Sequence, residues 1–554
     1  MDWTSIYHES GNEELLLYEI MAEMSHHQNS RTSRLLSVLQ YDTTTATTSP
    51  SIAQAQPPNL NYSIDEDYSS HRLFQYPSFH QDSTEQLSPS SSSYTLFALY
   101  CLAINYILGV GCLGVPYAFA KAGILFCFLI FTIVTVLSYI TVMWVAETGQ
   151  RFQQSQKIKR KQQLEQQQQN NNNNYNSSNE SSNLISKYHP EEINFEVLDL
   201  MGHYVGYYPQ ILYQISFMAL MYIGLLAYSQ VFCGSIAAIF PSISTPIPQI
   251  IFGTIVIPLS CMELEEQVSI QAIMALVRFL AIFTMIFGSI MNVSTTTPTT
   301  TTIAVPLWKE TGFAVAFSTA LFSQVFQHSV PGLIRPLHEN KVGKVPHIFA
   351  ASLLTTFVLY VVLGTVTTYS FGPNAIQSSI NLNFVNFTFG LSKGNALTVM
   401  ASQLVVMFPA LDTLSVFPLI ANTLGNNLFS SSPAFIQWIH RIQNNKSGED
   451  KIQQWKRASK IANITWKLIA SIPPLIGSIW STNLSFSFLL AGLSGVYVAF
   501  IAPSLLQYYS SQQQELLHHR GWYSYTQWIL PVISFATFAM CMLFYRIVTY
   551  LLSS

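Results

Sequence analysis

The chain has 554 residues, of which 49% are hydrophobic and 10% charged, with a formal net charge of −3. Its apolar residues come in blocks of about 20, the length that crosses a bilayer as a helix. This composition excludes a single soluble domain and predicts an all-α polytopic protein whose surroundings are the lipid bilayer. The charge balance gives no reason to expect a nucleic-acid partner. All six cysteines lie in or beside expected spans, so neither a disulfide framework nor a metal site is expected.

The first 93 residues are polar and rich in Ser, Gln and Thr. They contain no apolar run of the kind that a cleaved signal peptide needs. Their composition cannot bury enough apolar surface to offset the entropy of folding. We therefore expect a disordered cytosolic N-terminal tail over 1–93, followed by a transmembrane domain over 94–554.

The first expected span, about 95–120, carries three glycines and a proline near its centre: Gly109, Gly111, Gly114 and Pro116. Each glycine costs a helix interior roughly 1 kcal/mol relative to alanine, and proline about 3 kcal/mol. In lipid, non-helical backbone persists only where it is buried in protein or lines a cavity. We interpret this span as two half-helices with unwound backbone near 109–114. The alternative is a kinked helix whose small residues permit close packing.

A second span is expected at about 124–146. Residues 148–192, rich in Gln and Asn, are expected to form a disordered cytosolic insert, and 194–208 a short interfacial helix. Further spans are expected at about 209–240, 247–262, 268–292, 313–335, 346–371, 395–423, 461–481, 484–508 and 526–551, which gives eleven in total.

The sixth span is also interrupted. Polar residues occupy it between Ser323 and Ser329, and the Ser-Val-Pro triplet at 329–331 echoes the Gly-Val-Pro triplet at 114–116. Paired, interrupted spans in corresponding halves of a chain point to the binding site of a transporter.

Lys and Arg residues set the expected orientation. With a cytosolic N-terminus, the cytosolic loops between spans hold sixteen of them, and the opposite loops hold three, Lys121, Lys309 and Lys393. Cytosolic loops are enriched in Lys and Arg, so this bias predicts eleven spans with a non-cytosolic C-terminus. The sequon at Asn386 then falls on the non-cytosolic side and predicts a glycoprotein. A second sequon, at Asn292, lies close to the bilayer.

Several stretches resemble the amino acid/auxin permeases and, within them, the transmembrane protein 104 subgroup. They are residues 105–123, 318–336, 408–427 and 491–497. The resemblance covers about 95–550. It implies a five-plus-five inverted-repeat (LeuT-like) fold with one extra span and broken helices 1 and 6. Members of the family typically move amino acids together with Na⁺ or H⁺, so it also implies an amino acid substrate and symport.

The candidate substrate-binding residues are Gly109, Gly111, Cys112, Leu113, Gly114, Ser323, Phe326 and His328. A helix that starts near Gly111 is expected to present free amides to a substrate carboxylate, because a helix N-terminus attracts anions. Carbonyls in the break of the sixth span are expected to bind an amine. His328 titrates near neutral pH and is a candidate proton sensor, or else a hydrogen-bonded helix residue. Gly111→Ala is expected to cut substrate affinity, and Gly288→Ala is expected to do little.

The candidate ion-coupling residues are Asn105, Asp412 and Thr413. The resemblance implies that Asn105, one turn before the break, helps to hold an ion; the alternative is an amide bonded to a neighbouring helix. A charge such as Asp412 in a span costs about 2.5–3.5 kcal/mol, so it is normally functional or paired. We interpret it as a proton carrier or cation ligand, or alternatively as the partner of Arg278.

These features predict a secondary active transporter that moves amino acids by alternating access, coupled to H⁺ or Na⁺. The alternative is a non-transporting amino-acid sensor or signalling scaffold on the same fold, with the polar tail recruiting partners. The chain has no H-E-x-x-H, G-x-S-x-G or G-x-x-x-x-G-K motif, so neither an enzyme nor an ATP-driven pump is expected. No cofactor beyond the coupling ion is expected. The expected location is the plasma membrane or an endolysosomal or vacuolar membrane.

Overall fold

The computed structural model describes a helical protein over residues 95–172, 195–244, 246–261, 268–295, 305–335, 337, 339–390, 395–430, 449–481, 483–512 and 521–553. The tail predicted over 1–93 lies outside these residues.

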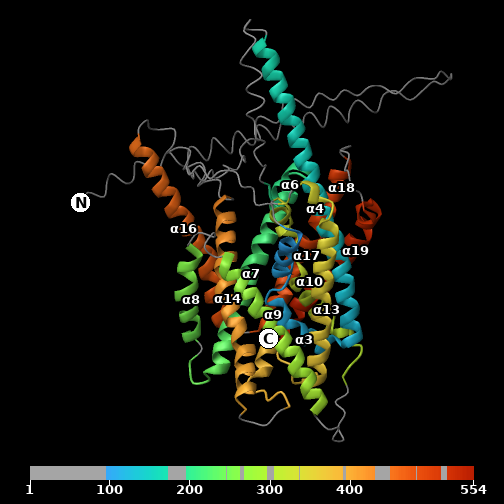
Figure 1. The fold of residues 1–554 in the computed structure, drawn as a ribbon, viewed down its shortest axis with the longest axis vertical. Helices are drawn as coiled ribbons and strands as arrows, with labels where there is room; N and C mark the ends of the chain where they lie inside the picture. Colours follow the sequence, from blue (N-terminus) through green and yellow to red (C-terminus); the bar gives the residue numbers. More distant parts are fainter. Residues whose placement is uncertain are drawn as a thin grey trace, which may run out of the picture. The chain divides into compact units, whose positions relative to one another are not determined.

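The helices of the first half are α2 (Leu96–Ile107), α3 (Gly111–Ala122), α4 (Ile124–Asn172), α6 (Val197–Tyr204), α7 (Tyr207–Ile239), α8 (Pro246–Cys261) and α9 (Val268–Thr295). The helices of the second half are η4 (Glu310–Gly312), α10 (Phe313–Gln324), η5 (Gln327–Ser329), α11 (Val330–Ile334), α12 (Glu339–Val342), α13 (Val345–Phe371), η6 (Ile380–Phe384), α14 (Ala396–Ser430), α16 (Glu449–Trp480), α17 (Leu484–Val496), η7 (Tyr497–Ile501), α18 (Ala502–Gln512), η8 (Trp522–Ser524), η9 (Thr526–Trp528) and α19 (Ile529–Ser553). The long helices run side by side (Figure 1).

Among the described residues, seven helices are long and apolar enough to cross a membrane, and the bent pair α2 and α3 raises this number to eight. The three remaining expected spans coincide with α8, with the pair α10 and α11, and with α16. The prediction of an all-helical, multi-pass membrane protein is therefore confirmed.

Helix α4 is longer than the span predicted at 124–146, because it continues to Asn172. Gln, Lys, Arg and Glu are good helix formers, and extending an existing helix requires no new nucleus. The buried pair of Arg151 and Glu147, with 3.3 Å between Nη2 and Oε2, ties the base of this extension to the span. The prediction of disorder is therefore wrong for 148–172, while 173–194 lie outside the described residues. The short helix predicted within 194–208 is confirmed as α6.

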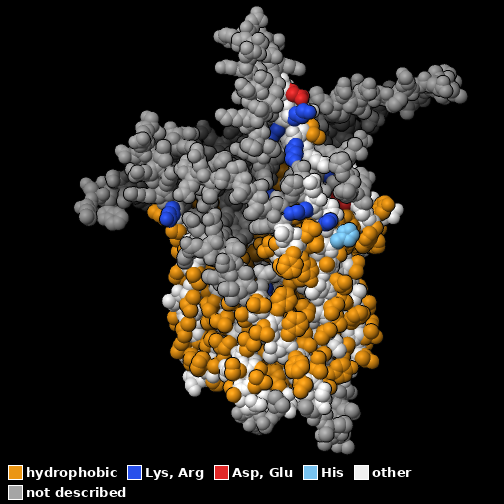
Figure 2. Space-filling view, viewed as in Figure 1, with side chains coloured by type: hydrophobic (Ala, Val, Ile, Leu, Met, Phe, Trp, Pro, Cys, Tyr) orange, Lys and Arg blue, Asp and Glu red, His pale blue; other side chains and the backbone are white. Residues whose placement is uncertain are grey.

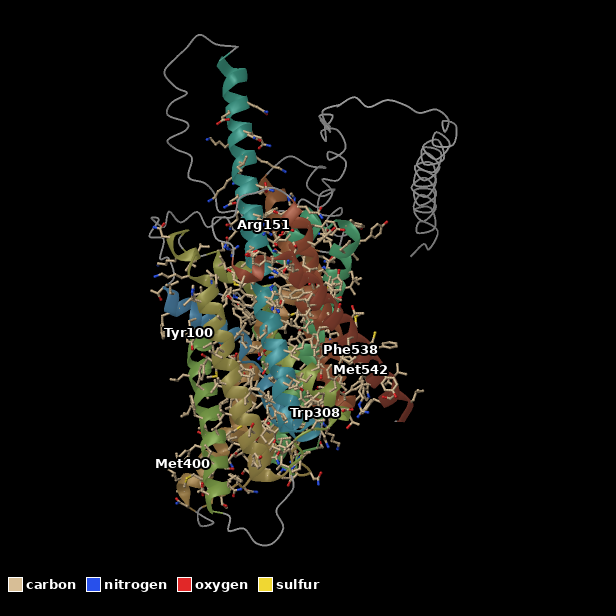
Figure 3. The ribbon with its side chains drawn as sticks, turned by 90° about the vertical axis from the view of Figure 1, so that its right-hand side faces the viewer. Tyr100, Arg151, Trp308, Met400, Phe538 and Met542 are labelled. Atoms are coloured by element: carbon tan, nitrogen blue, oxygen red, sulfur yellow. The ribbon has the colours of Figure 1, made fainter. Side chains whose placement is uncertain are left out.

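Charge and hydrophobicity separate along the helices. Lys and Arg side chains gather toward the upper end of the molecule as drawn in Figure 2, above a broad belt of hydrophobic side chains. Arg151 lies toward this upper end, and Trp308 and Met400 lie toward the opposite one (Figure 3). Phe538, on α19, is a large apolar side chain that is exposed on the belt, as a lipid-facing surface requires. Which end faces the cytosol stays a prediction from the loop charges.

The broken helices lie at the centre of the packing. Helix α10 packs against α3, α4 and α17, and α13 packs against α2, α3 and α9. Helix α14 packs against α7, α9 and α16. Residues of α4, α9, α13 and α14 can therefore reach the two breaks from different sides.

The two sequons differ in accessibility. Asn386 is exposed between η6 and α14, with a φ of 57°, a conformation that Asn tolerates better than most residues. The Asn292 amide nitrogen donates to the Ser370 hydroxyl oxygen at 3.0 Å, which ties it to α13. Glycosylation of Asn386 stays a prediction.

Candidate functional site

The first span is broken between α2 and α3, which meet at a bend of 57°. Leu108, Gly109 and Val110 separate the two helices, and α3 begins at Gly111, as predicted. The unwound stretch is shorter than the expected 109–114, because Gly114 lies inside α3. The break is thus confined to the last turn of α2 and the entry to α3.

The amides at the start of α3 are less free than the sequence suggests. The amide of Cys112 donates to the Gly109 carbonyl at 3.3 Å, and that of Leu113 donates to the Val110 carbonyl at 3.1 Å. Two of the three amides expected to bind a carboxylate are therefore bonded within the break itself. In this conformation the first turn of α3 is closed.

The glycines of the first span make close contacts. A Cβ atom on Gly111 would lie 2.8 Å from the Cα atom of Ser323, and one on Gly114 would lie 2.3 Å from the Phe488 ring. Real Cβ atoms do not approach other atoms this closely, so both positions require glycine for packing. The close packing that was the alternative to a break therefore occurs at both glycines, and the span is broken as well. The contact with Ser323 brings the two broken spans face to face.

Arg278, on α9, occupies the first break. Its Nη1 donates to the Asn105 carbonyl at 3.2 Å, to the Asn105 side-chain oxygen at 3.0 Å, and to the Leu108 carbonyl. Its Nη2 donates to Oδ1 of Asp412, on α14, at 2.5 Å. Arg278 and Asp412 are 3% and 4% exposed. The alternative partner predicted for Asp412 is thus the one that it has.

This arrangement accounts for backbone groups that the break releases. The last carbonyls of any helix lack intrahelical partners, and a buried carbonyl without one is costly. Here the carbonyl of Asn105, in the last turn of α2, and that of Leu108, in the break, accept from Arg278. The Ile107 carbonyl accepts from the Gly109 amide at 2.9 Å. Asn105, which was expected to help to hold an ion, instead accepts hydrogen bonds from Arg278 on a neighbouring helix, as the alternative for this residue has it.

Tyr360, on α13, joins the two breaks. Its buried hydroxyl lies 3.1 Å from the Ile107 carbonyl and 3.0 Å from the Ser323 carbonyl. A hydroxyl has one hydrogen, so the two carbonyls share this donor. The Ser323 carbonyl, one of those expected to bind an amine, is therefore already bonded to Tyr360.

The break of the sixth span lies at Val325 and Phe326, between α10 and η5. The Phe326 amide donates to the side-chain oxygen of Gln327 at 3.0 Å. The Gln327 amide nitrogen donates in turn to the hydroxyl of Thr141, on α4, at 3.1 Å. The Phe326 side chain is fully buried and packs against the ring of Phe349, with 5.6 Å between the ring centroids. Neutral groups on α4 thus hold this break.

His328 lies away from the contact between the breaks. Its ring packs against that of Phe217, on α7, with 5.3 Å between the centroids. Both residues line a small pocket beneath α6 that also includes Glu196. The structure therefore places His328 in a side pocket.

Some predicted residues come together and others do not. Asn105, Gly109, Gly111, Ser323 and Asp412 gather around the first break. The Thr413 hydroxyl instead bonds to the Ala410 carbonyl of its own helix at 2.9 Å. Sequence reasoning missed Tyr360, because a tyrosine in an apolar span carries no distinctive pattern. Among the described residues, no three His, Cys, Asp or Glu side chains are placed to hold a metal ion.

Comparison with known proteins finds a family whose model matches most of the chain. The family model described as transmembrane amino acid transporter protein matches residues 93–550. The transmembrane protein 104 homolog of Dictyostelium discoideum is 23% identical over 477 residues, which cover 76% of this chain and 89% of that protein. The homolog of Caenorhabditis briggsae is 21% identical, covering 84% of this chain and 99% of that protein. A solved manganese transporter from Eremococcus coleocola aligns with a TM-score of 0.40 and 11% identity, covering 83% of this chain and 94% of that one.

Proposed function

Because the chain belongs to the transmembrane amino acid transporter family, we propose that it moves amino acids across a membrane by alternating access, without an enzymatic step. The observation that carries this proposal is the direct contact of two broken spans, at Gly111 and Ser323. In transporters, substrate sites form near the bilayer midplane where discontinuous helices meet. The eleven-span, five-plus-five repeat is the architecture that we propose for this chain.

The contact between the breaks suggests how the substrate enters. Gly111 and Ser323 leave no room for a ligand between them, since even a Cβ atom on Gly111 would lie 2.8 Å from Ser323. The two breaks must therefore part before an amino acid can bind. Once apart, α3 offers its N-terminal amides to the carboxylate, and α10 offers its C-terminal carbonyls to the amine.

The amino acid zwitterion suits these partners. Both of its ends lose water on entering the site, and each buried polar group without a partner costs several kcal/mol. The carbonyl of Ser323 and the amides of Cys112 and Leu113 each have an internal partner in the closed state. The substrate would exchange these internal bonds for its own, so binding and parting of the breaks are linked.

Uptake into proteoliposomes tests the proposal. Full-length protein would be reconstituted and supplied with a mixture of the twenty standard L-amino acids, with pH and Na⁺ gradients set independently. We expect saturable uptake of at least one amino acid above that of empty liposomes. Saturable binding to purified protein without uptake would favour the alternative of an amino-acid sensor. Absence of both would overturn the proposal.

The matched variants for this assay are two glycine substitutions. Gly111→Ala places a methyl group against Ser323, whereas a Cβ atom on Gly224, in α7, would meet nothing within 4 Å. We expect Gly111→Ala to lose uptake and Gly224→Ala to retain it. Equal uptake by the two variants would show that the first break is not part of the transport site.

We also propose that Asn386 carries a glycan on the non-cytosolic side. Its exposure in the loop between η6 and α14 supports this assignment. Asn386→Gln should increase the gel mobility of protein from secretory membranes to that of glycosidase-treated protein. Unchanged mobility, in a protein that remains glycosidase-sensitive, would place the glycan elsewhere.

A further inference from the structure

Four oxygen atoms converge on the two terminal nitrogens of Arg278. Three lie at the end of α2 and in the break, namely the carbonyl and side-chain oxygens of Asn105 and the Leu108 carbonyl. The fourth is Oδ1 of Asp412, at 2.5 Å from Nη2. Carbonyls of unwound backbone, with a carboxylate nearby, are the ligands that a small hard cation takes from a broken helix. In this protein the same oxygens surround a side chain of the protein itself.

We propose that the Arg278 guanidinium is the resident cation of the first break, so that the protein binds no Na⁺ there and works without it. An arginine side chain keeps its proton in proteins, so this cation is permanent. It is also tethered to α9 and cannot leave with the substrate. The part of this proposal that concerns transport rests on the proposed function, whereas the part that concerns Na⁺ binding does not.

A metal ion and the guanidinium cannot share this site. Two unit positive charges about 4 Å apart repel each other at an effective dielectric constant near 20. This repulsion lowers the affinity for Na⁺ by about a thousandfold relative to the same site without the guanidinium. The oxygens of Asn105 and Leu108 are also engaged by Nη1, so an incoming ion would have to displace it. The Asp412 carboxylate then supplies one negative charge for one positive charge, and the pair is already neutral.

Removing the guanidinium should therefore create the ion site that the native protein lacks. Arg278→Ala leaves the Asp412 carboxylate facing the oxygens of Asn105 and Leu108, with space where the side chain was. Na⁺ that binds the folded variant will stabilise it in proportion to ligand concentration over Kd. Arg278→Lys keeps a tethered cation, and Arg278→Ala combined with Asp412→Ala removes the negative charge, so neither should respond to Na⁺.

The test is thermal unfolding of purified full-length protein in matched NaCl, KCl and choline chloride. We expect wild type and Arg278→Lys to show the same Tm in all three salts. Arg278→Ala should gain a Na⁺-specific rise of at least about 2 °C, and the double variant should gain none. A Na⁺-specific rise in wild type would overturn the proposal, as would Arg278→Ala that folds without any response.

A second measurement applies if Arg278→Ala does not fold. Initial uptake by wild-type proteoliposomes would be compared in NaCl and in choline chloride at the same pH. Equal rates support a resident cation, and a tenfold fall on removing Na⁺ overturns it. If wild type takes up no amino acid in either salt, the proposed function fails, and the wild-type Tm comparison alone decides whether Na⁺ binds.

Discussion

The break between α2 and α3 and the break between α10 and η5 both release backbone groups from their helices, but different chemistry satisfies each. At the first break, the carbonyls of Asn105 and Leu108 accept from a guanidinium that is paired with a carboxylate. At the second, the Phe326 amide donates to a neutral Gln327 side chain, which is held by a hydroxyl on α4. Tyr360 bonds to one carbonyl at each break, that of Ile107 at the first and that of Ser323 at the second.

This difference indicates how the breaks can behave when they part. A buried ion pair is costly to separate, because each ion loses its partner in a medium of low dielectric. The first break should therefore stay with α9 and α14 as one unit. The second break is bonded to α4 by neutral hydrogen bonds, each worth about 0.5–1.5 kcal/mol net. When the breaks part, the Tyr360 hydroxyl can stay bonded to only one of the two carbonyls that now share it.

The largest expected effect is at the first break. Arg278→Met leaves Asp412 buried and without its counter-ion, which should lower the free energy of unfolding by about 3–5 kcal/mol. Arg278→Met combined with Asp412→Leu should cost less than Arg278→Met alone, since the unpaired charge is gone. Unfolding in mixed detergent micelles measures both. A double variant that is less stable than the single one would contradict the assignment of the pair.

Gly111→Ala should come next. The added methyl group meets Ser323 backbone at 2.8 Å, and overpacking of this kind costs about 1–3 kcal/mol. Gly224→Ala is the matched control and should change stability by less than about 0.5 kcal/mol. Gly288, which the sequence suggested as a control, is unsuitable, because its Cβ atom would lie 2.2 Å from the Phe389 ring. Equal stability of the Gly111 and Gly224 variants would show that the breaks do not touch.

Tyr360→Phe tests the contact that the two breaks share. Loss of the hydroxyl leaves the Ser323 carbonyl without this donor in a buried place, at an expected cost of about 1–3 kcal/mol. The effect should be smaller than that of Arg278→Met, because no charge is exposed to an apolar interior. Unfolding under the same conditions compares them. A larger loss of stability for Tyr360→Phe than for Arg278→Met would mean that the neutral contact stabilises the first break more than the ion pair does.

The smallest effect is expected on the α4 side of the second break. Thr141→Val keeps the shape of the side chain but removes the acceptor for the Gln327 amide nitrogen, which retains a 3.4 Å contact with the Ser138 hydroxyl. The expected cost is about 0.5–1.5 kcal/mol. If Thr141→Val costs as much as Arg278→Met, the contrast between a charged and a neutral break is not supported.

Most of the helical organisation could be predicted from the sequence, because apolar blocks and Gly or Pro interruptions are local signals. The break before Gly111, the short helix α6 and the bounds of α7 and α13 follow from such signals. The helical extension of α4 over 148–172 was missed, because composition alone does not show that a Gln-rich segment continues an existing helix.

The site was only partly predictable. Glycines mark a break, but they do not show what fills it, and this depends on side chains far away in the sequence. Arg278 is 173 residues from Asn105 and 134 from Asp412. Tyr360 is 253 residues from Ile107 and has no distinctive neighbours in sequence. Candidate residues for the first break can therefore be named from the sequence, while the fold decides which of them are in contact.

Labelling of Cys112 tests most directly whether the two breaks part to admit a substrate. Its thiol is buried in the first turn of α3, next to the contact with the sixth span, and Cys127 in α4 is a buried thiol for comparison. Reconstituted protein would be treated with N-ethylmaleimide, with and without the twenty L-amino acids, and each site quantified by peptide mass spectrometry. If the breaks part and close on substrate, amino acids will change the labelling rate of Cys112 several-fold and leave that of Cys127 unchanged. A Cys112 rate that amino acids do not alter, in vesicles that take them up, would contradict a substrate site at the two breaks.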